Sequence, residues 1–341
     1  MLPYAIDLGN GYTKTSYGNK PRIMPSYVSQ VVNESDICDD FGPGGGAFLH
    51  YLSGARHDLI GTKWLLGEAA KISFPATYQR VVEASAGKIE YALQFALSDV
   101  LCCHKYQNVT IPTLYASLPD PLTDGEKFKK AVLGRHEIQL AHVNAPPDAR
   151  FHYFVTIENC KILHEGQGAF INAIATGTIP GGVAAGIIDC GSGTTIAQCF
   201  SANGHLIPSS RTVSPVGVHH LLKMIATDPR MKERIGGEGN LHLIQQAIED
   251  SSFSYGASNV DIEQIFREHR KVWAQSALRK ALEKFSSMKD EIDSILLVGG
   301  GAHIVKAICQ KSSIILSPNP QTANVMGMAR LAELKISRSA A

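Results

Sequence analysis

One ten-residue pattern occurs twice in this chain, and it constrains the fold more than any other feature. "AIDLGNGYTK" (5–14) and "IIDCGSGTTI" (187–196) share apolar residues followed by Asp, x, Gly, x, Gly, x, Thr, and Asp7 matches Asp189 at a separation of 182 residues (189 − 7). Each copy is followed by a turn signal and a second strand-like run, "RIMPS" in one case and "HLIPS" in the other. Two β-hairpins of the same kind, each opening one half of the chain, predict two similar α/β domains.

The residues of both hairpins suit a polyphosphate. Glycines at alternate positions let backbone N–H groups approach an anion without interference from a Cβ atom. A carboxylate at a strand end, here Asp7 or Asp189, can hold a hydrated Mg²⁺ that neutralises phosphate charge. One such hairpin alone would more simply be an ordinary glycine turn, and it is the duplication that favours phosphate. The residues predicted to bind phosphate are Gly9, Asn10, Gly11, Tyr12 and Lys14 in the first hairpin and Gly191, Ser192, Gly193 and Thr194 in the second.

A third glycine loop lies in "LLVGGGAHIV" (296–305), between a strand-like run and a helix-like one. It fits neither a Walker A loop nor the GxGxxG pattern. Close approach of the backbone together with a helix N-terminus suits the α-phosphate and nucleoside end of a nucleotide, so Gly299, Gly300, Gly301 and Ala302 are predicted to bind there. The structural alternative is a turn that needs one positive φ, for which a single glycine would be sufficient.

Composition narrows the classes of protein. The 341 residues are enough for two domains, and the net charge of +1 shows no basic excess, so direct binding of nucleic acid is not expected. The seven cysteines are odd in number and lack metal-ligand spacing, which favours a reducing cytosol. The N-terminus lacks the features of a signal peptide, and the longest apolar run is too short to span a bilayer. We therefore predict a cytoplasmic protein without membrane contact.

Periodicity gives a coarse order of elements. The pattern predicts a helix that starts near Ala84, single strands over 110–119 and 151–163, a helix over 164–177 and a long amphipathic helix over 259–285. The glycine-rich segment 33–61 is predicted to be an insertion or exposed loop, because "DDFGPGGGAF" is flexible by composition.

The three glycine motifs, in this order, resemble those of the actin-like ATPases, the superfamily of actin, MreB, ParM/StbA, sugar kinases and heat-shock ATPase domains. "DLGNGYTK" is similar to the phosphate-1 motif, "DCGSGTT" to phosphate-2 and "VGGG" to the adenosine motif, while "ASLPDPLTDGEKFKKAVLG" and "CKILHEGQGAF" are most similar to the ParM/StbA group and its archaeal relatives. The resemblance implies two ribonuclease-H-like α/β domains with a nucleotide cleft between them. Residues 1–164 would form domain I, with a C-terminal helix (321–336) packing back on it, and residues 165–320 would form domain II.

The resemblance also implies a role for Glu165, which matches the family residue that orients the water attacking the γ-phosphate. The alternative is that Glu165 only complements the dipole of the helix that follows it. Two departures from the family pattern stand in the second hairpin. Ser192 replaces an acidic residue of actin, and Ile196 and Ala197 stand where ParM-like proteins have an aspartate. The resemblance therefore assigns catalysis to Glu165 and Asp189, and water-mediated metal binding to Asp7 and Asp189.

The function implied is a filament-forming ATPase that hydrolyses Mg-ATP and acts in plasmid or DNA segregation or a related cytomotive role. The resemblance implies self-association head to tail and a DNA-binding adaptor as a partner. The alternatives are a small-molecule kinase of the same superfamily, which would need a carboxylate general base in an open cleft, and a nucleotide-binding scaffold with negligible turnover. The sequence does not decide between ATP and GTP.

Overall fold

The computed structural model of the protein describes residues 4–17, 20–38, 45–81, 87–100, 107–142, 149–305 and 314–340. The chain divides into two compact units, Met1–Gly181 together with Thr322–Ala341, and Gly182–Gln321. The division predicted from the sequence lies after residue 164 and thus ahead of helix α4 (Gln167–Ala175), which the structure groups with the first unit because it packs against α10 (Ala323–Ala340).

The first sheet of unit 1 has the strand order β12-β9-β1-β2-β3. Its central strand β1 is buried along its whole length, runs antiparallel to β2 and runs parallel to β9. This burial on both faces explains the continuous apolar character of the sequence before the first hairpin. The strands are β1 Tyr4–Leu8, β2 Tyr12–Tyr17, β3 Lys20–Pro25, β9 Leu114–Leu118 and β12 Cys160–His164.

A second sheet of seven strands, in the order β7-β4-β6-β5-β10-β11-β8, completes the β structure described for unit 1. Its strands are β4 Tyr27–Gln30, β5 Gly46–Gly54, β6 Lys63–Gly67, β7 Gln79–Arg80, β8 Asn108–Ile111, β10 Gly134–His142 and β11 Phe151–Ile157. The prediction of a loop over 33–61 is wrong for β5, a largely buried strand that pairs with both β6 and β10. The glycines around residue 44 obscured it, and residues 39–44 lie outside the described part.

Two segments predicted as single strands are each two strands in different sheets. The segment 110–119 divides into β8 and β9 at Pro112, which has no N–H to donate to a ladder. The segment 151–163 divides into β11 and β12 at a turn, where Glu158 N donates to Ile111 O and Asn159 O accepts from Leu114 N. Both segments therefore cross from the seven-stranded sheet to the five-stranded one.

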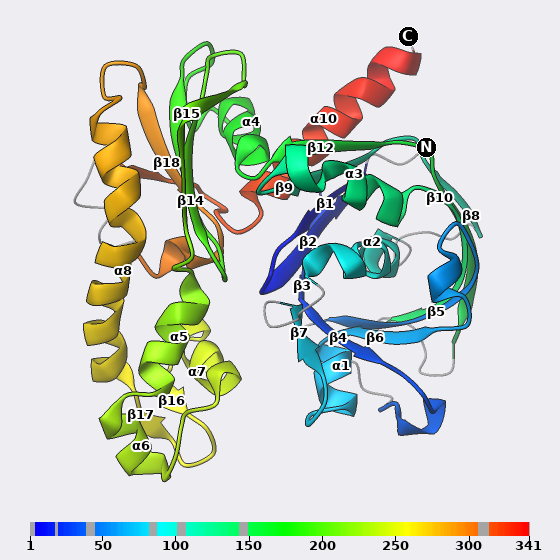
Figure 1. The fold of residues 1–341 in the computed structure, drawn as a ribbon, viewed down its shortest axis with the longest axis horizontal. Helices are drawn as coiled ribbons and strands as arrows, with labels where there is room; N and C mark the ends of the chain where they lie inside the picture. The colour runs from blue at the N-terminus through cyan, green and yellow to red at the C-terminus, as the bar shows by residue number, and fades with distance from the viewer. Residues whose placement is uncertain are drawn as a thin grey trace. The chain divides into compact units, whose positions relative to one another are not determined.

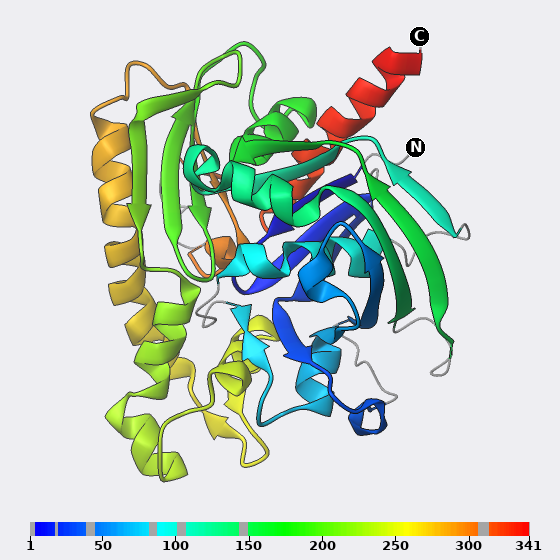
Figure 2. The same ribbon diagram turned by 45° about the vertical axis from the view of Figure 1, so that its right-hand side comes forward.

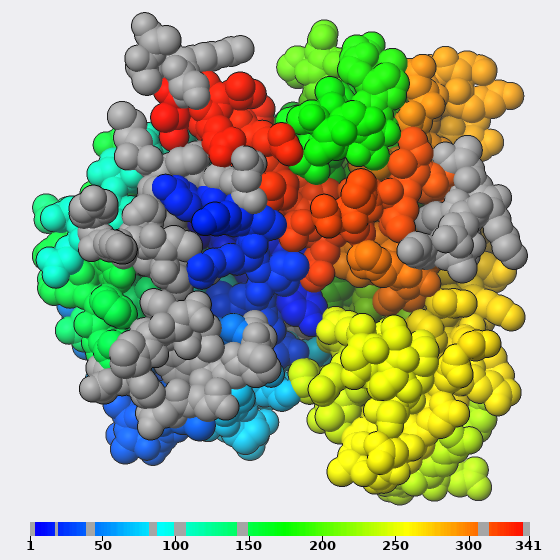
Figure 3. Space-filling view, turned by 180° about the vertical axis from the view of Figure 1, so that it is seen from behind, coloured from blue at the N-terminus to red at the C-terminus, as the bar shows by residue number. Residues whose placement is uncertain are grey.

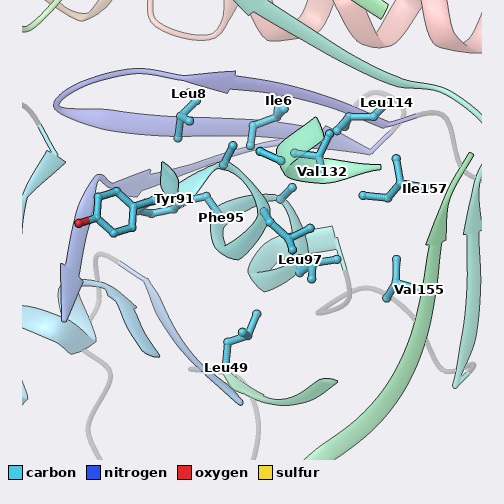
Figure 4. Packing of buried hydrophobic residues seen from close by; sticks show 14 of the residues in the cluster. Ile6, Leu8, Leu49, Tyr91, Phe95, Leu97, Leu114, Val132, Val155 and Ile157 are labelled. Atoms are coloured by element: carbon cyan, nitrogen blue, oxygen red, sulfur yellow. The ribbon is translucent and has the colours of Figure 1, made fainter. Parts of the chain in front are cut away.

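Helix α2 lies between the two sheets of unit 1 (Figures 1 and 2), and its side chains fill the core there. Figure 4 shows Ile6 and Leu8 of β1 pointing toward Phe95 and Leu97 of α2. The predicted start near Ala84 lies outside the described residues. The helices of unit 1 are α1 Glu68–Ser73, α2 Ala92–Val100, α3 Pro121–Val132, α4 and α10, with 3-10 turns at Glu34–Asp36 (η1), His57–Leu59 (η2) and Lys88–Tyr91 (η4).

Helix α10 covers the other face of the five-stranded sheet. Its residues Val325 and Met328 form a cluster with Ala5 of β1 and Tyr115 of β9. Figure 3 shows the red atoms of α10 beside the blue atoms of the first strands. Since side chains alternate between the faces of a strand, Asp7 lies on the same face as Ala5, toward α10.

Unit 2 repeats the topology of this five-stranded sheet, in the order β15-β14-β13-β18-β19. In both sheets, two strands of an antiparallel meander lie on one side of the central strand, and two strands that run parallel to it lie on the other side. The predicted α/β fold with two similar halves is thus confirmed. The strands are β13 Ala185–Cys190, β14 Thr195–Phe200, β15 Leu206–Ser214, β18 Ser294–Val298 and β19 Ile314–Leu316, with a separate ribbon of β16 Ser254–Tyr255 and β17 Val260–Asp261.

Helix α8 is the predicted long helix, and it runs beside β14 and β15 (Figure 1). Its Trp273 is fully buried and donates from Nε1 to Gly217 O at 2.9 Å, which ties the helix to the loop before α5. The helices described for unit 2 are α5 Val218–Ala226, α6 Pro229–Ile235, α7 Leu241–Glu249 and α8 Glu263–Ser286, and a 3-10 turn at Gly300–His303 (η6) follows β18.

Candidate functional site

Asp7 and Lys14 lie directly opposite each other across the β1–β2 hairpin. Lys14 Nζ is 3.3 Å from Asp7 Oδ2, and Ser117 Oγ donates to Asp7 Oδ1 at 3.2 Å. Asp7 is 8% exposed, so these two partners compensate a charge that has lost most of its water. Both oxygens of Asp7 are therefore held in fixed directions.

The turn of this hairpin is fixed by Ser26, a fully buried residue directly after β3. Its Oγ donates to Gly9 O at 2.6 Å, and its N–H donates to Gly11 O at 2.9 Å. A Cβ atom at residue 9 would lie 2.5 Å from Tyr12 O and 2.9 Å from Lys14 Nζ, so only glycine fits there. Two carbonyls of the turn thus point to Ser26, while Gly9, Asn10, Gly11 and Tyr12 remain partly exposed.

Glu165 follows β12 directly, as predicted, and its N–H donates to Leu118 O at 3.0 Å. The carboxyl ends of β1, β9 and β12 lie at one edge of the sheet because the three strands are parallel neighbours, and this places Glu165 at the same edge as Asp7. Its carboxylate Oε1 is 2.8 Å from Lys88 Nζ, and both side chains are 14% exposed. Helix α4 begins at Gln167, after Gly166 in the left-handed region.

The second hairpin belongs to unit 2. Asp189 is the penultimate residue of β13, and Gly191 N donates to Thr194 O at 2.9 Å to close the turn. Helix α5 starts against this turn, because Val218 N donates to Gly191 O at 3.1 Å and His219 N donates to Ser192 O at 2.9 Å. The carbonyls of the turn therefore satisfy the first N–H groups of α5.

The third glycine loop meets Asp189 within the same unit. Gly299 has φ 89°, and a Cβ atom there would lie 2.4 Å from Asp189 Oδ1. A Cβ atom on Gly301 would lie 2.7 Å from Val218 Cγ2, whereas one on Gly300 would have no neighbour closer than 3.8 Å. Two of the three glycines are thus required by the turn and its packing, and Gly300 alone has space. The side chain of Ala302 is buried.

The acidic groups suit magnesium held through water rather than a direct protein cage. Within the described ranges, no three His, Cys, Asp or Glu side chains gather into a set that could ligate a metal. Mg²⁺ typically keeps several waters and takes only one or two carboxylates together with substrate phosphates. A strand-end carboxylate with fixed orientation, such as Asp7, meets that requirement.

Four residues of these surroundings were not predicted as site residues: Ser26, Lys88, Ser117 and Asn324. Ser117 and Asn324 lie 110 and 207 residues from their hydrogen-bond partners, Asp7 and Ser117. A polar residue within the buried strand "LYASL" was the one available hint for Ser117. The others contact the site only through the tertiary fold.

Comparison with known proteins agrees with this geometry. Residues 5–168 match the family described as actin like proteins, N-terminal domain, and residues 187–310 match the archaeal actin homologue MreB-like family, C-terminal. The chain belongs to the actin-like proteins. Among curated proteins, none matches the sequence.

Solved structures share this actin-like fold over nearly the full chain. A ParM from a 15-stranded filament of Clostridium botulinum is 18% identical, with a TM-score of 0.72 and coverage of 98% of this chain and 100% of that one. The archaeal actin homologue Ta0583 is 17% identical, with a TM-score of 0.71 and coverage of 98% and 100%. Bacillus thuringiensis ParM with ATP is 16% identical, with a TM-score of 0.70 and coverage of 99% of each chain. In the part of this chain that the structure describes, each helix is too short or too polar to cross a membrane.

Proposed function

We propose that this actin-like protein is a nucleotide-dependent, filament-forming ATPase. The observation that carries the proposal is the pair of matched hairpins, each with an aspartate at the same place on the central strand of the same five-stranded topology. A hairpin with open glycine backbone and a strand-end carboxylate suits the phosphates and the hydrated metal ion of a Mg-nucleotide. The relatives that contain ATP or form a filament support the proposal by their fold.

Each side chain then has a defined task. Asp7 and Asp189 would hold Mg²⁺ through water, and Lys14 would balance the phosphate charge from the first hairpin. Bound Mg²⁺ neutralises charge on the phosphate oxygens. Glu165 orients the attacking water and accepts its hydrogen bond, and Lys88, with Nζ 2.8 Å from Oε1, fixes the direction of the Glu165 carboxylate. The glycine loop 299–301, with Ala302, contacts the nucleoside side.

The proposed biological role is that of a cytoplasmic, cytomotive polymer in plasmid or DNA segregation. Subunits would stack head to tail, a heterologous contact that extends without closing. Since the net charge of +1 provides no basic surplus for DNA, an adaptor protein would make the contact with DNA.

The test is high-speed sedimentation of the purified protein with Mg-ATP, Mg-ADP or no nucleotide, with phosphate measured in the same tubes. We expect nucleotide-dependent pelleting and phosphate release. Glu165→Gln should lower phosphate release about 100-fold while ATP binding persists. The matched control is Glu158→Gln, which changes an exposed carboxylate of the β11–β12 turn.

The other outcomes separate the alternatives. Protein that binds ATP but stays in the supernatant at every concentration would refute the filament and favour the small-molecule kinase. Pelleting without phosphate release, in both the wild type and Glu165→Gln, would indicate a nucleotide-binding scaffold instead of an ATPase.

A further inference from the structure

Two polar residues outside the three glycine motifs, Ser117 and Asn324, connect Asp7 to the first turn of α10. Ser117 Oγ donates to Asp7 Oδ1 at 3.2 Å, and Asn324 Nδ2 donates to Ser117 Oγ at 2.8 Å. We propose that Ser117 and Asn324 are positioning residues that orient the Asp7 carboxylate toward a hydrated magnesium ion. This inference rests on the proposed function, in which Asp7 holds Mg²⁺ through water.

The chain of donors has one direction. A serine hydroxyl has one hydrogen to donate and lone pairs to accept with. Because the Asn324 amide donates to Ser117, the hydroxyl hydrogen of Ser117 is directed to Asp7. The three residues are 1% to 8% exposed, so water competes little for these hydrogen bonds.

The β1–β9 register explains why Ser117 can reach Asp7. Ile6 pairs with Ala116 in the parallel ladder, so the next residues, Asp7 and Ser117, are neighbours with side chains on the same face. That face is the one that α10 covers. Asn324 enters it from the second position of the helix.

The position of Asn324 is itself fixed by α4. A Cβ atom on Gly168 would lie 2.1 Å from Asn324 O and 2.8 Å from Asn324 Oδ1, so the backbone of α4 packs directly on this residue. Gly168 is three residues beyond Glu165. The first turn of α10, which carries Asn324, therefore contacts both Ser117, the donor to Asp7, and α4, the helix that follows Glu165.

Unit 2 does not repeat these hydrogen bonds at the matching strand positions. Where unit 1 has Lys14 and Ser117, Asp189 has Ile196 and Val298 as strand neighbours. Neither side chain can donate a hydrogen bond. Holding the aspartate through a serine and an asparagine is thus a feature of the first hairpin and is not required by the shared topology.

The test measures ATP affinity by isothermal titration calorimetry, with Mg²⁺ and with EDTA, for the full-length wild type, Ser117→Ala and Asn324→Ala. The readout is the gain in affinity that Mg²⁺ provides. We expect both variants to reduce this gain about tenfold or more, as loss of a residue that orients a metal ligand does, with affinity in EDTA little changed. A purely structural role would change both affinities together.

The matched control is Asn172→Ala. It removes another polar contact between the same two helices, in which Arg330 Nε donates to Asn172 Oδ1 at 3.1 Å, and we expect it to leave the Mg²⁺ gain unchanged. Thermal unfolding verifies that every variant is folded. Ser117→Ala deletes one atom, so it tests the inference even if Asn324→Ala is too unstable to purify.

The outcomes distinguish the inference from the proposed function. If Mg²⁺ raises the ATP affinity of the wild type and of both variants by the same factor, Ser117 and Asn324 do not orient Asp7, and the proposed function is unaffected. If the wild type binds ATP equally well with and without Mg²⁺, then Asp7 does not hold Mg²⁺ through water, and Ser117 and Asn324 have no such role to support. A wild type that does not bind ATP overturns the proposed function itself.

Discussion

Acid should destabilise unit 1 through one buried histidine, His136. The ring is fully buried in β10, Tyr51 lies 2.9 Å from Nδ1, and Val132 O lies 3.0 Å from Nε2. Because the carbonyl can only accept, Nε2 carries the proton and Nδ1 accepts from the tyrosine hydroxyl. Burial, the largest cause, acts with the nearby Arg56 charge to lower the pKa of His136 from 6.5 to about 4, against the opposing effect of the hydrogen bond to Val132.

The size of the stability loss in acid follows from the linkage between proton binding and folding. The folded state disfavours the proton, so stability is full above the unfolded pKa of 6.5 and falls as the pH drops toward 4. At about 1.36 kcal/mol per pKa unit, the complete loss is about 3.4 kcal/mol, of which about 2 kcal/mol is lost between pH 7 and pH 5.

The assay is urea unfolding at pH 7, 6 and 5, followed by fluorescence. The chain has two tryptophans, Trp64 in β6 of unit 1 and Trp273 in unit 2. A Trp273→Phe background therefore leaves a reporter that belongs to unit 1. We compare His136→Gln with the parent and with His57→Gln, an exposed position.

The slope with pH is the decisive quantity, since His136→Gln also alters packing and lowers stability at every pH. We expect His136→Gln to lose about 2 kcal/mol less than the parent between pH 7 and pH 5. His57→Gln should follow the parent. If His136→Gln and the parent lose the same free energy of unfolding over this range, the histidine is not the cause of acid sensitivity and the reasoning is refuted.

Two further predictions concern the site itself. Lys88→Met should lower the rate constant of phosphate release about tenfold and Lys88→Arg should largely restore it, with ATP affinity unchanged, because Lys88 acts through Glu165; equal rates for all three proteins would refute its positioning role. Gly299→Ala should lower the free energy of unfolding by about 1–3 kcal/mol, since it combines a positive φ with a clash on Asp189, whereas Gly300→Ala should stay within about 0.5 kcal/mol of wild type. Thermal unfolding of the two alanine variants compares them directly, and an equal loss in both would contradict the packing argument.

Local sequence patterns identified the two hairpins, whereas Glu165 was assigned from the resemblance to the actin-like ATPases. The signals of the hairpins lie within about ten residues: an apolar run, an aspartate and spaced glycines that a turn requires. The 182-residue repeat then predicted a topology that both five-stranded sheets share. The amino-acid sequence alone was therefore sufficient to identify Asp7 and Asp189 as strand-end carboxylates.

Contacts over long sequence distances were not accessible from these patterns. The seven-stranded sheet joins β5 to β10. The glycines that precede β5 led to the prediction of a loop in place of this strand. Lys88 pairs with Glu165 across 77 residues, and Ser117 reaches Asp7 across 110. A lysine at a helix start and a serine in a strand carry no periodic signal, because their neighbours are set by tertiary packing.

The two units surround their strand-end aspartates with different contacts. In unit 1, Lys14 and Ser117 hold the aspartate through side-chain hydrogen bonds and charge. In unit 2 the matching strand neighbours are apolar, and the glycine loop at Gly299 lies against the carboxylate of Asp189 instead. Hydrogen bonds and charge fix the direction of the Asp7 carboxylate, whereas the loop packs so closely on Asp189 that a Cβ atom on Gly299 would lie 2.4 Å from Oδ1. The shared element is thus the aspartate at the strand end. In the proposed function, the hydrogen bonds of the first setting orient the metal shell, and the second setting brings the backbone of the glycine loop close to the carboxylate.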